Sequence, residues 1–284
     1  MSVSIGIYEK ALPQNLPWEE RLTRAQSSRF DFVELSIDES DERLGRLDPS
    51  SLERRAIRDA VVYTGLPLKT MCLSGHRRFA LGSSSAATRQ RADEIFARAI
   101  DLGCELGVRI IQVTGHFVYY EEETPFSANY YQEGLARALE LAAGAGIMLA
   151  IENMDTGGII SLRQGIEFVR QFDSPWLKLY PDIGNLSERS QATLTELALA
   201  RGHMVAMHLK DARPGEPRRV PFGEGTVPFG AAFAKLRELG FQGPYMIEMW
   251  NDNSVDSERR AQAARAWIVQ KMAAAGLIQD QETL

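Results

Sequence analysis

Several features that mark other classes of protein are absent from this 284-residue sequence. It contains only two cysteines, Cys72 and Cys104, which excludes a disulfide framework and makes a reducing cytoplasm the expected location. No apolar run approaches the roughly 20 residues needed to span a bilayer. The opening residues, MSVSIGIYEK, lack the basic start and long apolar core of a signal peptide. We therefore expect a soluble protein with no membrane partner.

Positive charge is also in short supply. The 32 Lys and Arg residues are outnumbered by 38 Asp and Glu residues, which gives a net charge of −6 and argues against a dedicated nucleic-acid binder. No G-x-G-x-x-G motif follows a predicted strand, which disfavours an open dinucleotide-binding sheet. No linker-like stretch or shift in composition divides the chain. We therefore predict one domain over residues 1–284, with a peripheral C-terminal tail after about residue 276.

Apolar strand-like segments alternate with helix-like segments along the whole sequence. The predicted strands are Val3–Tyr8, Phe30–Ile37, Leu68–Ser74, Arg109–Thr114, Ile147–Glu152, Leu177–Ile183, Met204–Lys210 and Tyr245–Met249. The predicted helices are 17–28, 50–65, 86–106, 126–145, 161–172, 191–201, 231–239 and 254–275. Such alternation implies parallel pairing through right-handed crossovers. Eight units in 284 residues predict an α/β fold, a closed (β/α)8 TIM barrel.

Four polar residues recur at or near the ends of successive predicted strands. They are Glu152, Asp182, His208 and Glu248, separated by 30, 26 and 40 residues, one strand–helix unit each time. A single residue of this kind is more often a salt-bridged or exposed rim residue. Because the carboxyl ends of barrel strands surround one mouth, four in register favour a shared site. Three carboxylates and one imidazole suit a divalent ion: Zn²⁺, Mn²⁺ or Co²⁺, with Mg²⁺ also compatible.

Basic residues after two of the strands are candidates to hold a phosphate group. We predict substrate or phosphate binding by Ser74, His76, Arg77, Lys210, Arg213 and Arg219, with Arg78 and Arg218 as neighbouring candidates. The competing interpretation is that most of these side chains are solvated loop charges, and that His76 bonds a backbone carbonyl. The segment GEGTVPFG, residues 223–230, lacks the lysine of a P-loop. It is interpreted as a tight turn.

A combination of short motifs gives the sequence a family resemblance. They are MCLSGHRRF (71–79), IENMDT (151–156), YPDIGN (180–185), MHLKDARPG (207–215), VPFGEG (220–225) and YMIEMW (245–250). With them, the chain resembles the sugar-phosphate isomerase/epimerase barrels, and within these the L-ribulose-5-phosphate (L-xylulose-5-phosphate) 3-epimerases. The resemblance covers essentially the whole chain. It implies a divalent ion held by Glu152, Asp182, His208 and Glu248, with the two glutamates also transferring protons.

The chemistry of C3 epimerisation is consistent with this resemblance. A proton next to the C2 carbonyl is removed and returned on the opposite face, so an enediolate forms between the two steps. A metal ion would stabilise that charge, and two carboxylates on opposite faces could serve as base and acid. The expected substrate is a small sugar phosphate, and a homodimer is the expected assembly.

Three other functions are compatible with parts of the sequence. An aldose–ketose or hexulose-phosphate isomerase would use the same enediolate with proton transfer between C1 and C2. An endonuclease IV-like DNA-repair enzyme would use a similar barrel, but four histidines in all are few for a multi-zinc site, and the chain is acidic. A catalytically silent sugar-binding barrel has no need of two opposed glutamates at one metal. Deuterium exchange from solvent would separate epimerase from isomerase.

Overall fold

Eight parallel strands form the centre of the molecule. The computed structural model describes residues 3–189, 192–252, 254 and 256–278. The sheet has the order β6-β5-β4-β3-β2-β1-β10-β7, and every pairing within it is parallel. Its strands are β1 (Ile5–Tyr8), β2 (Phe32–Ile37), β3 (Leu68–Leu73), β4 (Ile110–Thr114), β5 (Met148–Glu152), β6 (Leu177–Leu179), β7 (Met207–Leu209) and β10 (Tyr245–Ile247).

Two isolated bridges close this sheet into a ring. Leu179 pairs with Met204, and Asp182 pairs with His208, both in parallel orientation. The His208 amide also donates to the Pro181 carbonyl at 2.8 Å. These bridges connect the two edge strands β6 and β7, so the predicted (β/α)8 barrel is confirmed.

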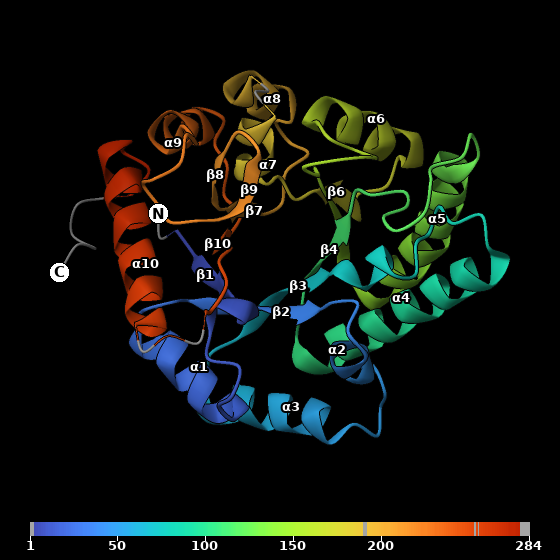
Figure 1. The fold of residues 1–284 in the computed structure, drawn as a ribbon, viewed down its shortest axis with the longest axis horizontal. Helices are drawn as coiled ribbons and strands as arrows, with labels where there is room; N and C mark the ends of the chain where they lie inside the picture. The colour runs from blue at the N-terminus through green and yellow to red at the C-terminus, as the bar shows by residue number, and fades with distance from the viewer. Residues whose placement is uncertain (1–2, 190–191, 253, 255, 279–284) are drawn as a thin grey trace.

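Helices surround the strands, as Figure 1 shows. They are α1 (Trp18–Ser27), α2 (Asp41–Gly45), α3 (Leu52–Thr64), α4 (Ala86–Leu106), α5 (Ser127–Ala145), α6 (Leu162–Phe172), α7 (Ile183–Glu188), α8 (Thr193–Leu199), α9 (Phe229–Glu238) and α10 (Ser257–Ala274). Among the described helices, none is long and apolar enough to cross a bilayer. Gly65, at the end of the helix predicted over 50–65, follows α3 in the left-handed conformation with φ of 69°, which costs glycine little.

The two faces of each strand have different roles. Val33, Leu35 and Ile37 of β2 belong to the main core, which the strands share with the surrounding helices. The alternate residues of the same strand, Phe32 and Glu34, point into the barrel because successive side chains of a strand face opposite sides. Phe32 fills part of the interior next to Gly6, where an added Cβ would lie 2.3 Å from the ring.

Three segments differ from their predicted structure. The strand predicted at Leu177–Ile183 ends at Leu179, because Asp182 accepts hydrogen bonds from the Gly184 and Asn185 amides and so starts helix α7. The short helix α2 had no predicted counterpart. The loop predicted after His208 contains a hairpin, β8 (Asp211–Arg213) and β9 (Glu216–Val220).

The glycine-rich segment 223–230 folds around one carboxylate. Asp211 accepts hydrogen bonds from the amides of Gly223 at 2.8 Å and Gly225 at 3.0 Å. A Cβ on Gly225 would lie 1.9 Å from Asp211 Oδ1, so this close approach needs glycine. The segment is therefore a turn, as predicted. The last residues of the predicted C-terminal tail, 279–284, lie outside the described residues.

Candidate active site

The four residues predicted as metal ligands converge at one end of the barrel. Glu152 is the last residue of β5, Asp182 precedes α7, His208 lies within β7 and Glu248 follows β10 directly. Each offers one ligand atom, and these atoms all lie within 4.8 Å of one another. The backbone enforces this proximity, because Asp182 pairs with His208 and the Glu248 amide donates to the Leu209 carbonyl at 2.8 Å.

His208 lies between two carboxylates. Its Nδ1 is 2.9 Å from Glu152 Oε1, and its Nε2 is 3.0 Å from Glu34 Oε1. The Tyr180 ring packs against the imidazole at a centroid distance of 4.2 Å. Burial opposes protonation of His208, but Glu34 and Glu152 outweigh it and hold its pKa well above the usual range. The sequence predictions missed Glu34, which is fully buried; its only signal was a carboxylate on the inward face of an apolar strand.

Amide side chains hold the other ligands in place. Gln112 Nε2 donates to Glu152 Oε2 at 2.6 Å. Asn153 accepts from the Asp182 amide at 2.9 Å and donates to the Asp182 carbonyl at 3.1 Å. Asn185 in turn donates to the Asn153 carbonyl at 2.8 Å. These neutral residues fix the orientation of the carboxylates without supplying positive charge.

Lys210 lies among the carboxylates. Its Nζ is 2.8 Å from Asp182 Oδ2 and 3.5 Å from Glu248 Oε2. The side chain is buried, and although burial disfavours its charge, Asp182 and Glu248 raise its pKa above the usual range. The sequence predicted Lys210 as a phosphate ligand, but in the structure its ammonium group pairs with two of the converging carboxylates, those of Asp182 and Glu248.

In this cluster the carboxylates outnumber the cationic side chains. Burial raises the pKa of Asp182 to about 7; Lys210 opposes this change, and Glu248 and Glu152 add to it. Burial also disfavours the charge of Glu248, but Lys210 and His208 outweigh it and lower the pKa to about 2. Asp182 Oδ2 and Glu248 Oε2 accept no hydrogen bond from the described residues, although Lys210 is within ion-pair distance. Buried carboxylate oxygens of this kind, with an imidazole beside them, fit a divalent cation.

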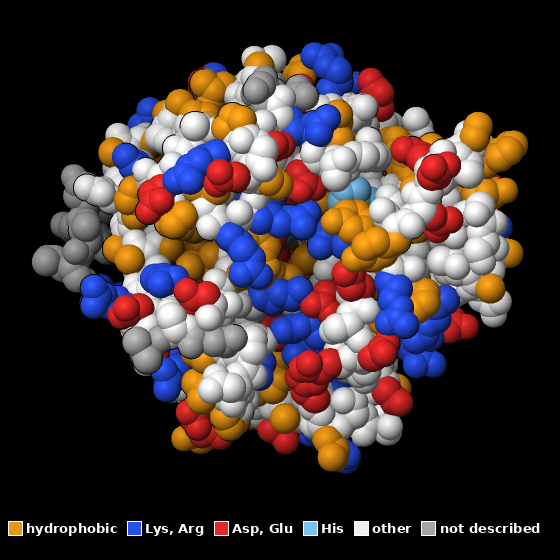
Figure 2. All heavy atoms as spheres, in the orientation of Figure 1, with side chains coloured by type: hydrophobic (Ala, Val, Ile, Leu, Met, Phe, Trp, Pro, Cys, Tyr) orange, Lys and Arg blue, Asp and Glu red, His pale blue; other side chains and the backbone are white. Residues whose placement is uncertain are grey.

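The carboxylates open into a cleft with a cationic rim. Lys10, Arg77, Arg218 and Arg219 line it, together with Ser74, Trp250, Tyr8 and the ligands Glu152 and Glu248. Figure 2 shows Lys and Arg side chains gathered around the hollow at the centre of this face. A negatively charged group entering the cleft would therefore meet positive charge at the rim.

Two of the rim cations have no carboxylate partner among the described residues. Arg77 stacks over Tyr119 at 5.2 Å, and its buried Nε has no hydrogen-bond partner there. Arg219 has a left-handed backbone with φ of 64° and lies over Trp250 at 5.9 Å. That conformation is unfavourable for arginine and is found mainly where the surroundings impose it. By contrast, Arg218 pairs with Asp155 at 3.0 Å.

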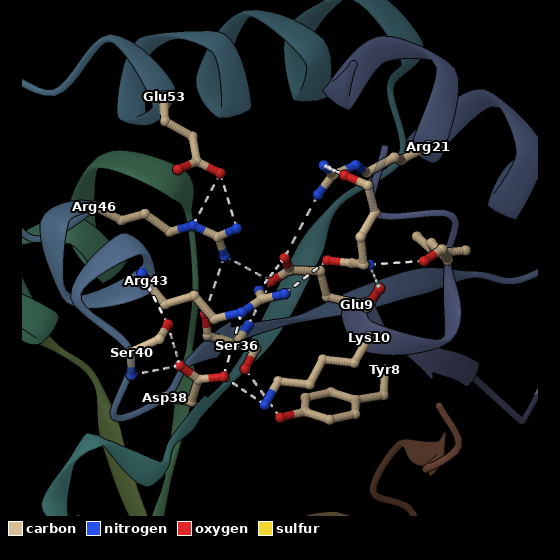
Figure 3. A network of polar contacts seen from close by, with 12 residues as sticks. Tyr8, Glu9, Lys10, Arg21, Ser36, Asp38, Ser40, Arg43, Arg46 and Glu53 are labelled. Carbon is tan, nitrogen blue, oxygen red and sulfur yellow. Dashed lines mark hydrogen bonds and ion pairs between the residues drawn. The ribbon is translucent and has the colours of Figure 1, made fainter. Parts of the chain in front are cut away.

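Lys10, which the sequence predictions missed, is held at the rim by a second network of charges. Its Nζ lies 2.5 Å from Asp38 Oδ2, and Arg43 Nε lies 3.3 Å from the same oxygen. Arg43 also pairs with Glu9, the residue before Lys10 in the chain. Figure 3 shows these side chains, with Arg46 and Arg21 on the far side of Glu9. Asp38 thus holds the ammonium group of Lys10, and Arg43 links Asp38 to Glu9.

The structure separates the predicted phosphate-binding residues. Ser74, Arg77, Arg219 and Lys210 line the cleft. His76 does not line it: its Nε2 lies 3.1 Å from the Ala92 carbonyl and its ring packs on Phe96 at 4.4 Å. Burial lowers the pKa of His76 to about 4. The backbone-carbonyl alternative considered for this histidine therefore matches its position.

Arg213 also lies away from the cleft. It is partly exposed, and it donates to the Glu224 carbonyl at 2.8 Å and to the Glu224 carboxylate at 3.1 Å. A further contact joins it to Glu216 at 3.3 Å. Arg213 thus fits the solvated loop-charge interpretation and does not meet the metal-ligand cluster.

The chain matches a known family and several known enzymes. The model of the xylose isomerase-like TIM barrel family matches residues 22–271. Two relatives named L-ribulose-5-phosphate 3-epimerase UlaE, from Escherichia coli O1:K1 / APEC and Shigella boydii serotype 18, are each 43% identical over 277 residues, covering 98% of both chains.

Solved structures show the same fold. A structure of L-ribulose 3-epimerase is 21% identical, covers 100% of this chain and 99% of its own, and has a TM-score of 0.79. A D-psicose 3-epimerase with D-tagatose, from Clostridium cellulolyticum H10, is 16% identical with a TM-score of 0.79, covering 95% and 99%. At 16% and 21% identity, these structures support the barrel fold alone. The 43% identical relatives show the family by sequence.

Proposed function

The chain belongs to the xylose isomerase-like TIM barrel family, and from that membership we propose that it is a divalent-metal-dependent sugar-phosphate 3-epimerase. The proposed reaction interconverts L-ribulose 5-phosphate and L-xylulose 5-phosphate, as the names of the 43% identical relatives suggest. The observation that carries the proposal is the convergence of Glu152, Asp182, His208 and Glu248 within 4.8 Å. This cluster lies at the floor of a cleft with a cationic rim.

Glu152, Asp182, His208 and Glu248 would hold the ion. When bound, a divalent cation supplies Lewis-acid stabilisation of the negative charge that develops on an enediolate. Zn²⁺, Mn²⁺ and Co²⁺ all suit one imidazole and three carboxylates, and Mg²⁺ is also compatible. Gln112 and Asn153 would keep Glu152 and Asp182 oriented.

Glu152 and Glu248 are the proposed base and acid at C3. One removes the C3 proton, and the other returns a proton on the opposite face, which inverts the carbon. The lowered pKa of Glu248 keeps this group ionised at neutral pH, as a base must be. Lys210, paired to Glu248 and Asp182, stabilises the ionised form of both.

The phosphate is proposed to bind at the rim. Arg77 and Arg219 are the favoured ligands because they line the cleft and lack carboxylate partners among the described residues. Ser74 supplies a neutral donor beside them. Charge-assisted contacts to a dianion would also explain why the arginine at 219 sits in an unfavourable backbone conformation.

Metal removal combined with isotope exchange tests the function. The purified protein would be stripped with a chelator, reloaded with Mn²⁺, Co²⁺, Zn²⁺ or Mg²⁺, and assayed on L-ribulose 5-phosphate in deuterated water. We expect activity only after reloading, with deuterium at C3. Deuterium confined to C1 or C2 would identify an aldose–ketose isomerase, and cleavage of abasic DNA a repair nuclease. Full activity of rigorously metal-free protein would overturn the proposal.

Three further expectations stay predictions: a cytoplasmic location, a homodimer, and no binding of nucleic acid. The acidic net charge of −6 supports the last of these. Sedimentation and a binding assay with duplex DNA would check assembly and nucleic-acid binding directly.

A further inference from the structure

We propose that Glu34 is a positioning residue that presents Nδ1 of His208, and not Nε2, to the metal ion. The inference rests on the proposed metal-dependent function and goes beyond it, because Glu34 is not one of the four converging ligands. Glu34 also does not line the cleft and is fully buried. It therefore acts through His208 and does not contact substrate.

The hydrogen bonds of Glu34 assign a separate role to each carboxylate oxygen. Oε2 accepts from the Thr70 hydroxyl at 2.6 Å and from the Tyr180 hydroxyl at 2.8 Å. Oε1 is left for His208 Nε2, 3.0 Å away. The Oε2 oxygen is thus held by Thr70 of β3 and by Tyr180, which follows β6. The Oε1 oxygen points at the imidazole.

An ionised carboxylate can only accept hydrogen bonds, so the contact with Glu34 Oε1 places a hydrogen on His208 Nε2. The other ring nitrogen, Nδ1, lies 2.9 Å from Glu152 Oε1, an oxygen of a converging ligand. By the same argument, Nδ1 carries a hydrogen towards Glu152 in the metal-free protein. A cation bound by Glu152 would displace that proton, so that Nδ1 offers its lone pair while Nε2 keeps its hydrogen. This is the arrangement in which a carboxylate fixes the tautomer and raises the basicity of a metal-ligating histidine.

A purely structural role explains the surroundings of Glu34 less well. Glu9 is equally buried, but it is surrounded by the guanidinium groups of Arg43 and Arg46. In the described part of the chain, the only ion-pair contact of Glu34 is with His208. A buried carboxylate without Arg or Lys is costly to retain for packing alone, whereas a cation coupled through His208 would compensate it.

Replacing the carboxylate by an amide tests the inference. Glu34→Gln keeps the size but puts an NH₂ group within reach of His208 Nε2, which favours the tautomer with hydrogen on Nδ1. We expect a roughly 10–100-fold weaker affinity for Zn²⁺ or Co²⁺, the usual effect of losing such a partner, measured by competition with a chelator. Glu34→Asp keeps an acceptor-only group, so a smaller loss of affinity is expected. Glu9→Gln is the matched buried control and should bind metal as tightly as the wild type.

Long-range ¹H–¹⁵N spectra of the histidine rings supply a second readout. In the zinc-loaded wild type, Nε2 of His208 should carry the hydrogen and Nδ1 should show the shift of a metal-bound nitrogen. Three results would overturn the inference: Nε2 as the ligand, a Glu34→Gln affinity within twofold of the wild type, or tighter binding by Gln than by Asp at position 34. If the wild type itself binds no metal, the proposed function fails first, so the two failures are distinguishable.

Discussion

Two clusters of charged side chains lie at the carboxyl ends of the barrel strands. Cations outnumber carboxylates in one of them, and carboxylates outnumber cations in the other. In the first, Glu9 is surrounded by Arg43, Arg46 and Arg21. Together with Lys10, Asp38 and Glu53 this cluster holds four cations and three carboxylates (Figure 3). In the second, the four carboxylates of Glu34, Glu152, Asp182 and Glu248 form ion pairs, within the described part of the chain, only with His208 and Lys210.

The difference separates a structural ion network from a site prepared for a ligand. Glu9 finds all its partners inside the protein: burial opposes its ionisation, but Arg46 and Arg43 lower its pKa nonetheless. In the second cluster, burial raises the pKa of Asp182 to about 7, and Glu248 and Glu152 add to this rise although Lys210 opposes it. A buried group of like charges is retained at a cost only if something completes it. A divalent cation would do so, whereas the Glu9 cluster already contains four cationic side chains.

The largest expected effect follows from removing the proton-transfer groups of the acid-rich cluster. Glu152→Gln and Glu248→Gln keep side-chain size and one carbonyl oxygen, so folding and metal binding should persist, though metal binding weakens. Loss of general acid–base assistance should lower the epimerisation rate by ~10²–10⁴. If the two groups act on opposite faces, at least one variant should still exchange the C3 hydrogen of one epimer with solvent. Near-wild-type epimerisation by either metal-loaded variant would remove that residue from the role.

The corresponding change in the cation-rich cluster should affect folding and leave the metal site intact. Glu9→Gln removes the buried carboxylate that Arg43 and Arg46 share and leaves them only Asp38 and Glu53 as partners. The free energy of unfolding should fall by about 3–5 kcal/mol, measured by urea denaturation of the metal-free protein. A loss of metal affinity comparable to that of a Glu152 or Glu248 variant would show that the two clusters are coupled.

Replacing either rim arginine that lacks a carboxylate partner among the described residues should weaken the use of a phosphorylated substrate and leave the stability of the fold unchanged. Arg77→Met or Arg219→Met should remove charge-assisted hydrogen bonds worth about 1.5–3 kcal/mol each. The kcat/KM for L-ribulose 5-phosphate should therefore drop roughly 10–100-fold per residue, with little change for free L-ribulose. Arg213→Met is the control, because that side chain pairs with Glu224 and Glu216 outside the cleft. Equal kcat/KM for L-ribulose and its 5-phosphate in the wild type would refute the phosphate assignment.

The smallest expected effect concerns His76, a buried imidazole that stays uncharged at neutral pH because burial lowers its pKa. Burial lowers the pKa of His76 from 6.5 to about 4, so the unfolded chain binds a proton more readily than the folded one. The stability that this histidine contributes is therefore complete above pH 6.5 and is lost as the pH falls towards 4. Between pH 8 and pH 5, His76→Gln should lose about 2 kcal/mol less stability than the wild type. Parallel pH profiles from urea denaturation would contradict this.

The barrel and the convergence of four polar side chains at its mouth could be predicted from the sequence. Apolar runs alternating with helical segments require parallel strands, and the carboxyl ends of such strands meet at one mouth. Glu152, Asp182, His208 and Glu248 could therefore be placed together from spacing alone. The proton-transfer role of the two glutamates was implied by the family resemblance. Even here, Asp182 reaches the site by capping α7 and not from within a strand, because its side chain competes for backbone amides.

Which neighbours complete the site depends on contacts that form only in the folded barrel. In the turn Ser74–Arg77, successive side chains point in different directions, so Arg77 faces the cleft while the adjacent His76 packs under α4. Lys210 is directed at Asp182 because it lies on the inward face two residues after His208. Glu34 comes from β2, far along the chain from His208, and the two meet only when the barrel closes. Contacts made across a closed ring depend on side-chain direction and strand register, which spacing along one sequence does not encode.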